Sequence, residues 1–432
     1  MKSRWYRWLF VVAAIVVLTF GLRACFFDDD LADIEPQEAI DAELTLQAVT
    51  LEQPDEDGTL LWRLKAESVN YIPDTQRADL IQLEGEFFQA GEVIYTVEAN
   101  EGEVLQNGNT LFLRGDLVAT GRENELTLEG EKLKWLPKRD LLVMGEFEDS
   151  DEFEDAPASE LTPDETTNLS TNDELTPDAL QLLESTPPLT SDKAPVTGFN
   201  PQIKAVARIV KVNNKENRVE LTGGVSAESK ESPWLLFQSD SLLWFTDREI
   251  IEANQPLKVE QFDSDQYELV TDRLVGNKGQ VELAENKVTL SEAVQLDSLT
   301  QPLTVKSKQA VWEVEAERVV MDQPVDIEQP ERQITAQANQ AELDLAEQVI
   351  VLAGDVKAVG KENDSRLAAD SVTWQTTTQQ IQAEGNVSYQ QADDPDISIA
   401  GPRATGNLET GIVVIEGGES GEVVTEIIPD GF

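Results

Sequence analysis

The sequence predicts an all-β protein. We expect an extended antiparallel β-jellyroll, an open half-pipe of stacked repeats of about 31 residues each, preceded by one N-terminal transmembrane or signal helix. Three observations support this: apolar and polar residues alternate along short runs, a short glycine-containing phrase recurs, and an apolar segment opens the chain. Alternation with a period of two is typical of half-buried strands. A fixed repeat period indicates stacked units that share one core.

The composition excludes several classes of function. The formal net charge is −50, so phosphate would be repelled and we expect no nucleic-acid partner. Histidine, the commonest general base and metal ligand, is missing. A single cysteine permits neither an intrachain disulfide nor a zinc motif. Carboxylates are abundant, but no context marks a catalytic pair. We therefore expect no catalytic residues, no metal, no cofactor and no enzymatic activity.

Residues 1–30 predict attachment to a membrane. Three basic residues precede the apolar run Trp8–Leu22, and acidic residues follow it, so the rest of the chain should be exported. The run forms an uncleaved anchor if the span extends to Phe27. Alternatively, Leu22–Cys25 resembles a lipobox, with Cys25 as the candidate lipidation site, although Arg23 departs from that pattern. In both cases the chain is tethered and works outside the cytoplasm.

Residues 31–43 are acidic and predict a stalk, and strands should follow over residues 44–147. In the first strand, Leu44, Leu46 and Ala48 are expected on one side. The same alternation continues in three later runs, and turn-forming residues separate the runs. The later inward-facing sets are Trp62, Leu64 and Ala66; Val93, Tyr95, Val97 and Ala99; and Leu111, Leu113 and Leu117.

Residues 148–199 break this pattern. The segment is rich in Asp, Glu, Ser, Thr and Pro, and it cannot bury enough apolar surface to offset the entropy of ordering. We expect a disordered acidic linker. Within it, "TPDALQLLE" favours one short helix, with Thr176 as its cap and Pro177 in its first turn.

Strands should resume over residues 200–432, where the repeat is clearest. Val294, Val325, Val356 and Val387 recur at one constant interval along the chain. Trp244, Trp312 and Trp374 precede Leu257, Val325 and Val387, each at the same separation in sequence. In "VLAGDVKAVG" and "IQAEGNVSYQ" a glycine precedes the apolar residue by two positions, which predicts a bend or bulge. Two copies have Gln-Pro instead, at Pro256 and Pro324, which predicts a strand end.

Residues 1–147 resemble the LptC family of lipopolysaccharide export proteins. The resemblance rests on the short anchor, the acidic stalk, "DG" before Trp62-x-Leu64-x-Ala66 with Tyr71 next, and Ala99-x-x-Gly102-x-Val104 before Leu111-x-Leu113-x-Gly115-x-Leu117. Residues 200–428 resemble OstA/LptA-like jellyroll repeats. The chain departs from usual family members in its greater length and its acidic linker.

The resemblance implies a periplasmic lipid carrier anchored in the inner membrane. It would accept lipopolysaccharide from the ABC transporter of the Lpt system and pass it along an apolar groove towards the outer membrane. ATP is hydrolysed elsewhere. The partners would be that transporter and, through edge-to-edge β pairing, an LptA-like or outer-membrane LptD-type jellyroll. The implied lipid-binding residues are Trp62, Leu64, Ala66, Tyr71, Tyr95, Val97, Ala99, Val104, Leu111, Leu113 and Leu117.

A second interpretation stays open. An exported structural or adhesive β-solenoid would also explain repeats, acidity and export, but it would not bind lipid. It would not account for the resemblance of residues 1–147 to LptC.

Overall fold

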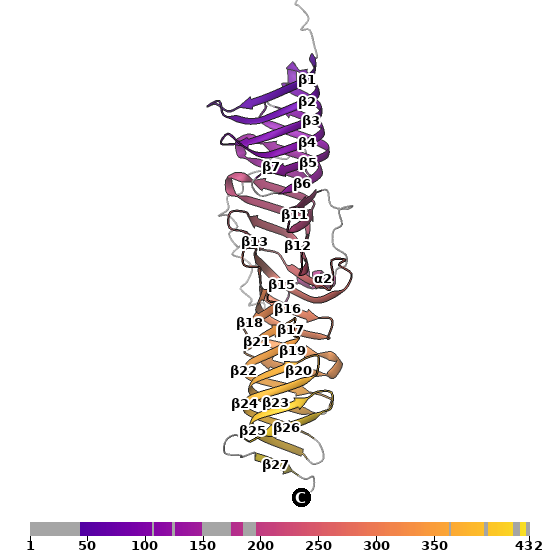
Figure 1. The fold of residues 1–432 in the computed structure, drawn as a ribbon, viewed down its shortest axis with the longest axis vertical. Helices are drawn as coiled ribbons and strands as arrows, with labels where there is room; N and C mark the ends of the chain where they lie inside the picture. Colours follow the sequence, from indigo (N-terminus) through magenta and orange to yellow (C-terminus); the bar gives the residue numbers. More distant parts are fainter. Residues whose placement is uncertain are drawn as a thin grey trace, which may run out of the picture. The chain divides into compact units, whose positions relative to one another are not determined.

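The computed structural model describes residues 44–105, 108–122, 126–148, 174–184, 196–362, 364–392, 396–417 and 424–428. In these residues, 27 antiparallel strands join into one sheet, from β1 (indigo) to β27 (yellow) in Figure 1. The strands before the acidic segment are β1 (Leu44–Pro54), β2 (Leu60–Ile72), β3 (Arg77–Gln89), β4 (Glu92–Leu105), β5 (Thr110–Gly121), β6 (Thr127–Leu136) and β7 (Leu141–Gly145).

The remaining elements follow in the order of the chain. The acidic segment carries α2 (Pro177–Glu184), and the sheet resumes at β8. Short 3-10 turns stand at η1 (Pro73–Thr75), η3 (Pro137–Arg139), η4 (Asn214–Glu216) and η5 (Pro330–Arg332). The strands are β8 (Val196–Phe199), β9 (Ile203–Ala207), β10 (Ile209–Asn213), β11 (Arg218–Ser229), β12 (Trp234–Phe245), β13 (Ile250–Ala253), β14 (Leu257–Phe262), β15 (Val270–Glu282), β16 (Lys287–Ser298), β17 (Leu303–Glu313), β18 (Arg318–Met321), β19 (Val325–Gln329), β20 (Ile334–Ala338), β21 (Gln340–Asp344), β22 (Val349–Gly360), β23 (Ser365–Gln375), β24 (Gln380–Gln391), β25 (Asp396–Asn407), β26 (Ile412–Glu416) and β27 (Val424–Ile428).

Each long strand bends near its middle, so the sheet forms two walls. Wall A contains β7, β10, β13, β18, β21 and β26, and wall B contains β8, β9, β14, β19, β20 and β27. The long strands contribute one half to each wall. In β11, for example, residues 218–222 pair with β10 in wall A, and residues 226–229 pair with β9 in wall B. The expected antiparallel β architecture is confirmed, and helix is limited to short pieces in the described residues.

The recurring glycine phrase marks the bends. At Gly354–Asp355 both residues have positive φ, 77° and 49°, and at Gly385–Asn386 the values are 75° and 49°. The pairing register shifts at both places. Two successive left-handed residues displace the strand from its regular pleat and form a bulge. The predicted role of these glycines is therefore confirmed, and the apolar residues that follow, Val356 and Val387, are buried at 1% exposure.

Proline acts differently at the same position of the repeat. β13 ends at Ala253 and β14 begins at Leu257, with Pro256 between them. Similarly, Pro324 stands between the end of β18 and the start of β19. Proline lacks the N–H that a continuous strand would need, so these copies break the strand instead of bending it, as the sequence predicts.

The repeat period corresponds to two bent strands, one leading out and one leading back. Four strands begin at this interval, at Lys287, Arg318, Val349 and Gln380. A unit of two strands has neighbours on both sides in each wall, so its inward apolar residues are buried only within the stack.

The acidic segment leaves and re-enters the sheet at one bend. β7 ends in wall A at Gly145, and β8 begins in wall B at Val196. A Cβ atom at Gly145 would lie 2.9 Å from the Val196 side chain, so the two ends of the segment meet. β7 pairs with β10, and β6 pairs with β8, so both walls continue past the segment. The division into domains at residues 147 and 200 stays a prediction.

Helix α2 docks on wall B. Thr176 Oγ1 accepts a hydrogen bond from the backbone N–H of Ala179 (3.3 Å), which confirms the predicted cap. The side chain of Asn277 in β15 fixes the start of the helix: its Oδ1 accepts from the backbone N–H of Thr176 (2.9 Å), and its Nδ2 donates to the carbonyl of Glu174 (3.2 Å). Ala179 is fully buried.

An ion cluster lies in the part of wall B that α2 contacts. Lys258 and Glu260 alternate with core residues of β14, yet they are only 1% and 4% exposed. Glu260 accepts from Arg273 Nε (2.7 Å) and lies 3.4 Å from Lys258 Nζ. Burial lowers the pKa of Lys258, and the carboxylate of Glu260 opposes that shift.

The expected alternation in β1 holds only up to Ala48. Leu46 pairs with buried Val69 and so lies on the inward side, although its place in the edge strand leaves it 38% exposed, whereas beyond Ala48 the residues that pack against the core are Val49 and Leu51. The cause is Ala48, whose φ of 52° places a bend inside the strand. A residue that leaves the regular pleat reverses which alternate side chains face inward in the rest of the strand.

Two expectations concern residues 1–43, which lie outside the described residues: the membrane-spanning or lipidated N-terminus with Cys25, and the acidic stalk. In the described part, no helix is long and apolar enough to cross a membrane.

Replacing Gly354 with alanine should destabilise the sheet more than the same change at Gly411. Both glycines have positive φ, 77° and 69°, which costs an L-residue roughly 1–2 kcal/mol. A Cβ at Gly354 would also lie 2.8 Å from Asn339 Nδ2, whereas a Cβ at Gly411 meets nothing within 4 Å. Urea unfolding of both variants should therefore show a larger loss for Gly354→Ala. Equal losses would contradict a packing role of the bend glycine.

Asp272→Asn should stabilise the protein at neutral pH. Asp272 is 9% exposed, and burial raises the pKa of its carboxyl above the ordinary value of 3.8, against the opposing hydrogen bonds of Ser298 and Thr271. A raised native pKa means that the native state holds the proton more readily than the unfolded chain, so stability is lost as pH rises through that native value. Asparagine removes this loss.

Urea unfolding at several pH values measures the effect. The gain from Asp272→Asn should be present at pH 7 and shrink as the pH falls towards 3.8. Asp240→Asn is the matched control, because Asp240 is exposed. A gain that did not depend on pH would show that the carboxyl charge is not its cause.

Candidate functional site

The inward-facing apolar side chains of both walls form one buried cluster, which extends from Trp62 to Ala404. Most of the implied lipid-binding residues belong to it, each with 8% exposure or less: Trp62, Leu64, Ala66, Tyr95, Val97, Ala99, Val104, Leu111, Leu113 and Leu117. Tyr71 is the exception. It is 36% exposed and lies outside the cluster, because it stands near the end of β2, opposite Leu44 of the edge strand β1.

The walls are in direct contact at the N-terminal level. Phe87 of wall B stacks on Trp135 of wall A, with ring centroids 4.9 Å apart and planes 3° from parallel. Polar contacts join the rims beside this stack. Trp62 Nε1 donates to the carbonyl of Gly108 (2.9 Å), and Gln89 Nε2 donates to Asp140 Oδ2 (3.4 Å). Burial raises the pKa of the Asp140 carboxyl, and the hydrogen bond from Gln89 opposes this.

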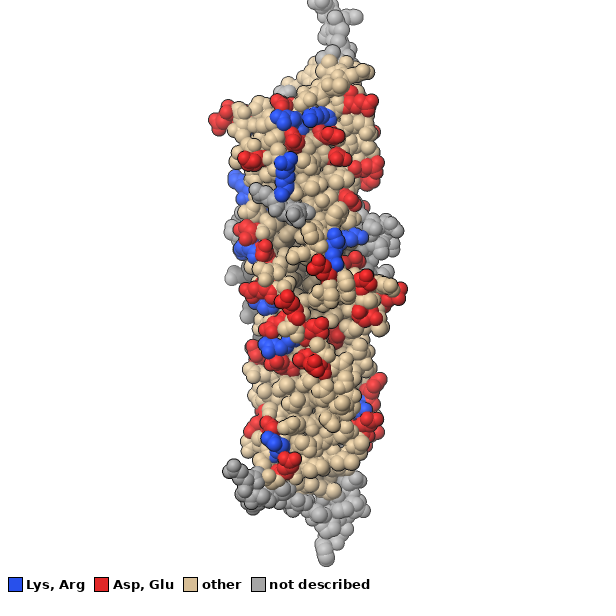
Figure 2. Space-filling model, viewed as in Figure 1, with Lys and Arg blue, Asp and Glu red and all other residues tan. Residues whose placement is uncertain are grey.

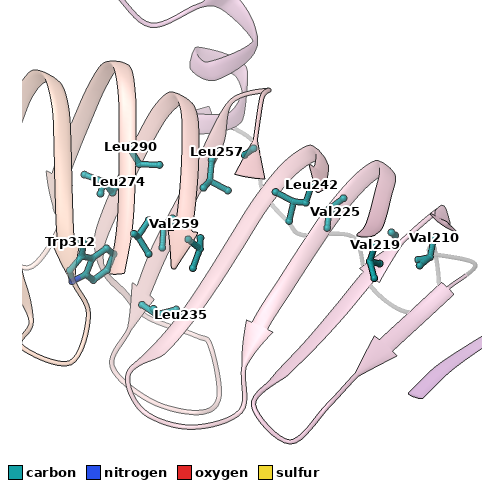
Figure 3. Packing of buried hydrophobic residues seen from close by; sticks show 14 of the residues in the cluster. Val210, Val219, Val225, Leu235, Leu242, Leu257, Val259, Leu274, Leu290 and Trp312 are labelled. Atoms are coloured by element: carbon teal, nitrogen blue, oxygen red, sulfur yellow. The ribbon is translucent and has the colours of Figure 1, made fainter. Parts of the chain in front are cut away.

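Beyond this level the walls enclose an apolar groove. Its space is about 1000 Å³, including the part open to solvent. Wall A contributes residues such as Val219, Leu221 and Trp244, and wall B contributes residues such as Leu128 and Phe237. Figure 3 shows side chains of this region that point from successive strands into one interior, among them Val210, Val219, Val225 and Leu242. A concave space lined almost entirely by apolar side chains is typical of sites for apolar ligands.

Side-chain size explains where the groove opens. Its lining includes Gly198, Ala205, Ala207, Ala227 and Ala253, which leave room between the walls. Large rings fill the N-terminal level instead, including Trp62, Phe87, Tyr95 and Trp135. The residues that the resemblance implies, between 62 and 117, do not line this groove. Alanine also occupies inward positions of the closed level, for example Ala66 and Ala99, so no single residue type in the sequence marks the groove.

A second cavity lies near the C-terminal end of the described residues. Its space is about 1250 Å³, with apolar walls that include Ile334, Leu367 and Ile381. Its lining also includes charged residues, so it is more polar than the first groove. Arg332 Nη1, in a turn of wall B, donates to the carbonyl of Leu408 in a turn of wall A (3.1 Å).

Glutamines also connect the two rows of turns. Gln301 Nε2 donates to Gln348 Oε1, and Gln379 Nε2 donates to Gln301 Oε1, both at 3.4 Å. Gln301 belongs to wall B, whereas its two partners belong to wall A. Together with Arg332, these side chains bridge the open side of the half-pipe around the second cavity. The two glutamine bonds are long and join side chains only, so they can break without disturbing either wall, whereas the bond of Arg332 ends on a backbone carbonyl.

The outer surface is highly charged. Figure 2 shows acidic side chains spread over one face, with basic side chains beside many of them. Exposed pairs include Lys278–Glu292 (2.7 Å) and Arg318–Glu342 (3.1 Å). In the described residues, most charged side chains therefore lie on a solvated exterior around an apolar interior. Among the described residues, no group of three or more His, Cys, Asp or Glu side chains is placed to hold a metal ion.

The sequence was compared with known families and structures. The family described as "Lipopolysaccharide-assembly, LptC-related" matches residues 10–143 and 328–418, which together make up just over half of the chain. No curated protein matches the sequence. The chain is similar to the crystal structure of LptH, the LptA homologous periplasmic component of the conserved lipopolysaccharide transport device from Pseudomonas aeruginosa. That likeness has 13% identity and a TM-score of 0.27, and it covers 30% of this chain and 97% of LptH.

The two matched segments include the closed N-terminal level and the second cavity, and they flank the region that carries most of the first groove. With more than half of its length matched, the chain belongs to the LptC-related family of lipopolysaccharide-assembly proteins.

Proposed function

We propose that this protein carries lipopolysaccharide across the periplasm. In this proposal it is held at the inner membrane by its N-terminus, takes lipid from the ABC transporter of the Lpt system, and passes it towards the outer membrane. The proposal rests on one observation: in a chain of this family, two facing walls enclose an apolar groove. Transport of this kind requires no catalytic residue, because the energy is supplied by the transporter.

The physical basis is the separation of an apolar interior from a charged exterior. Each methylene group of an acyl chain that moves from water into the groove gains roughly 0.8 kcal/mol. The polar headgroup stays in water at the open side of the half-pipe. A groove that continues between the same two walls lets the acyl chains move along the protein without re-entering water.

The free edges of the sheet supply the contacts with partners. β1 pairs only with β2, so its other edge is open within the described residues. At the opposite end, β26 and β27 each pair only with β25. An open edge accepts a further strand by backbone hydrogen bonds. We assign the β1 edge to the transporter and the β26–β27 edge to an LptA-like or LptD-type jellyroll.

The eleven implied lipid-binding residues form the first part of the path in this proposal. Ten of them lie inside the cluster, where the stack of Phe87 on Trp135 closes the interior. Lipid that enters beside β1 therefore requires this stack to open. In this proposal Tyr71 stands at the entrance, because it is partly exposed and lies beside β1.

Photocrosslinking in cells tests the proposal. A photoreactive amino acid at Leu221 should capture lipopolysaccharide, because Leu221 lines the open groove. The same probe at Glu220 is the matched control, since the neighbouring residue of a strand faces the other side. The same probe at Leu113, with Arg114 as its control, tests whether lipid passes through the closed N-terminal level.

Two outcomes would contradict the proposal. One is lipid capture at Glu220 equal to that at Leu221. The other is no capture at Leu221 in a protein that is folded and exported. The second result would favour a dry core and the structural β-solenoid interpretation.

A further inference from the structure

Four tryptophans occupy equivalent positions along wall A: Trp135, Trp244, Trp312 and Trp374. Each is the second-last residue of its strand, in β6, β12, β17 and β23 respectively. Each pairs with the residue seven positions later, across the turn. The partners are Leu142, Ile251, Val319 and Ile381.

The tryptophans alternate with aliphatic residues from one hairpin to the next. The hairpins between them carry Val212, Val281 and Leu343 at the same position. Successive tryptophans are therefore four strands apart along wall A. With neighbouring strands about 4.8 Å apart, this corresponds to roughly 19 Å between equivalent indoles.

The indole N–H groups of this row are unused. The Nε1 atoms of all four are buried, and none has a hydrogen-bond acceptor among the described residues. Trp135, Trp312 and Trp374 are 0%, 2% and 6% exposed, and Trp244 lines the open groove. Trp62, in wall B, differs, because its Nε1 donates to the carbonyl of Gly108.

A repeated unpaired donor indicates a ligand. A buried N–H without a partner costs folding free energy, and tryptophan N–H groups in protein interiors usually find an acceptor. Four such groups at one position of the repeat make an accidental defect a poor explanation. The position also restricts the ligand, because the indoles stand beside the turns, at the border between the apolar interior and the solvated rim.

We propose that the four indoles form a row of hydrogen-bonding stations for the carbonyl oxygens of ester- or amide-linked acyl chains. This inference rests on the lipid-carrying function proposed above. In an acylated lipid the carbonyl lies where the apolar chain meets the polar headgroup. When the acyl chain lies in the groove and the headgroup lies outside, the carbonyl group reaches the border where the indoles lie. Equivalent stations at regular intervals hold successive positions of a lipid that moves along the wall.

Two lipids that differ only in the linkage test this inference on the full-length protein. The probes are a short-chain, water-soluble diester glycerophospholipid and the diether compound with the same chain lengths, which lacks carbonyl groups. The full-length protein should bind the diester about threefold to tenfold more tightly, the ratio that one net hydrogen bond gives. Trp244 is the member of the row that lines the open groove, so Trp244→Phe should remove this preference, whereas the loss of indole packing would weaken the binding of both lipids equally.

Trp234→Phe is the matched control, because Trp234 packs against Tyr267 and does not line the groove. It should keep the preference for the diester. The inference is overturned if the unchanged protein binds both lipids equally, or if Trp244→Phe keeps the preference. Binding of neither lipid would instead overturn the lipid-carrying function, and this inference with it. Binding of the diether by Trp244→Phe also shows that the variant has folded.

Discussion

The bend in the middle of the strands is the constraint on which the rest of this structure depends. Two facing walls need both halves of every strand to turn apolar side chains inward, and a regular pleat cannot do this around a corner. Left-handed residues such as Gly354–Asp355 and Gly385–Asn386 solve the problem locally. Because the bends recur at matching positions along the chain, the corners of neighbouring strands coincide, and the interior between the walls is continuous.

The volume of the inward side chains decides whether the two walls touch. Phe87 and Trp135 fill the space and close the interior, whereas Ala207 and Ala253 leave a groove. The backbone is the same in both regions, so a conduit and a packed core are two outcomes of one architecture. The polar contacts of Gln301 and Arg332 across the open side add a third element, a rim that side-chain hydrogen bonds hold together.

The sequence predicts local features well and collective features poorly. Alternation and the regular repeat period predict the strands, the buried faces and the bends at the glycine phrase, because each depends on a few neighbouring residues. The change of inward positions in β1 to Val49 and Leu51 is not predicted, since no glycine marks the bend at Ala48. The pairing of β6 with β8 across the acidic segment has no local signal. The position of the groove depends on side chains from many strands together.

The acidic segment leaves the sheet at Gly145 and returns at Val196, where its two ends touch. Both walls are already complete without its backbone, since β7 pairs with β10 and β6 with β8. A chain cut within residues 149–173 would therefore yield two fragments whose strands still belong to the same ladder. The strands of each fragment would pair with strands of the other. A protein cleaved in this segment is therefore expected to stay associated through these backbone hydrogen bonds.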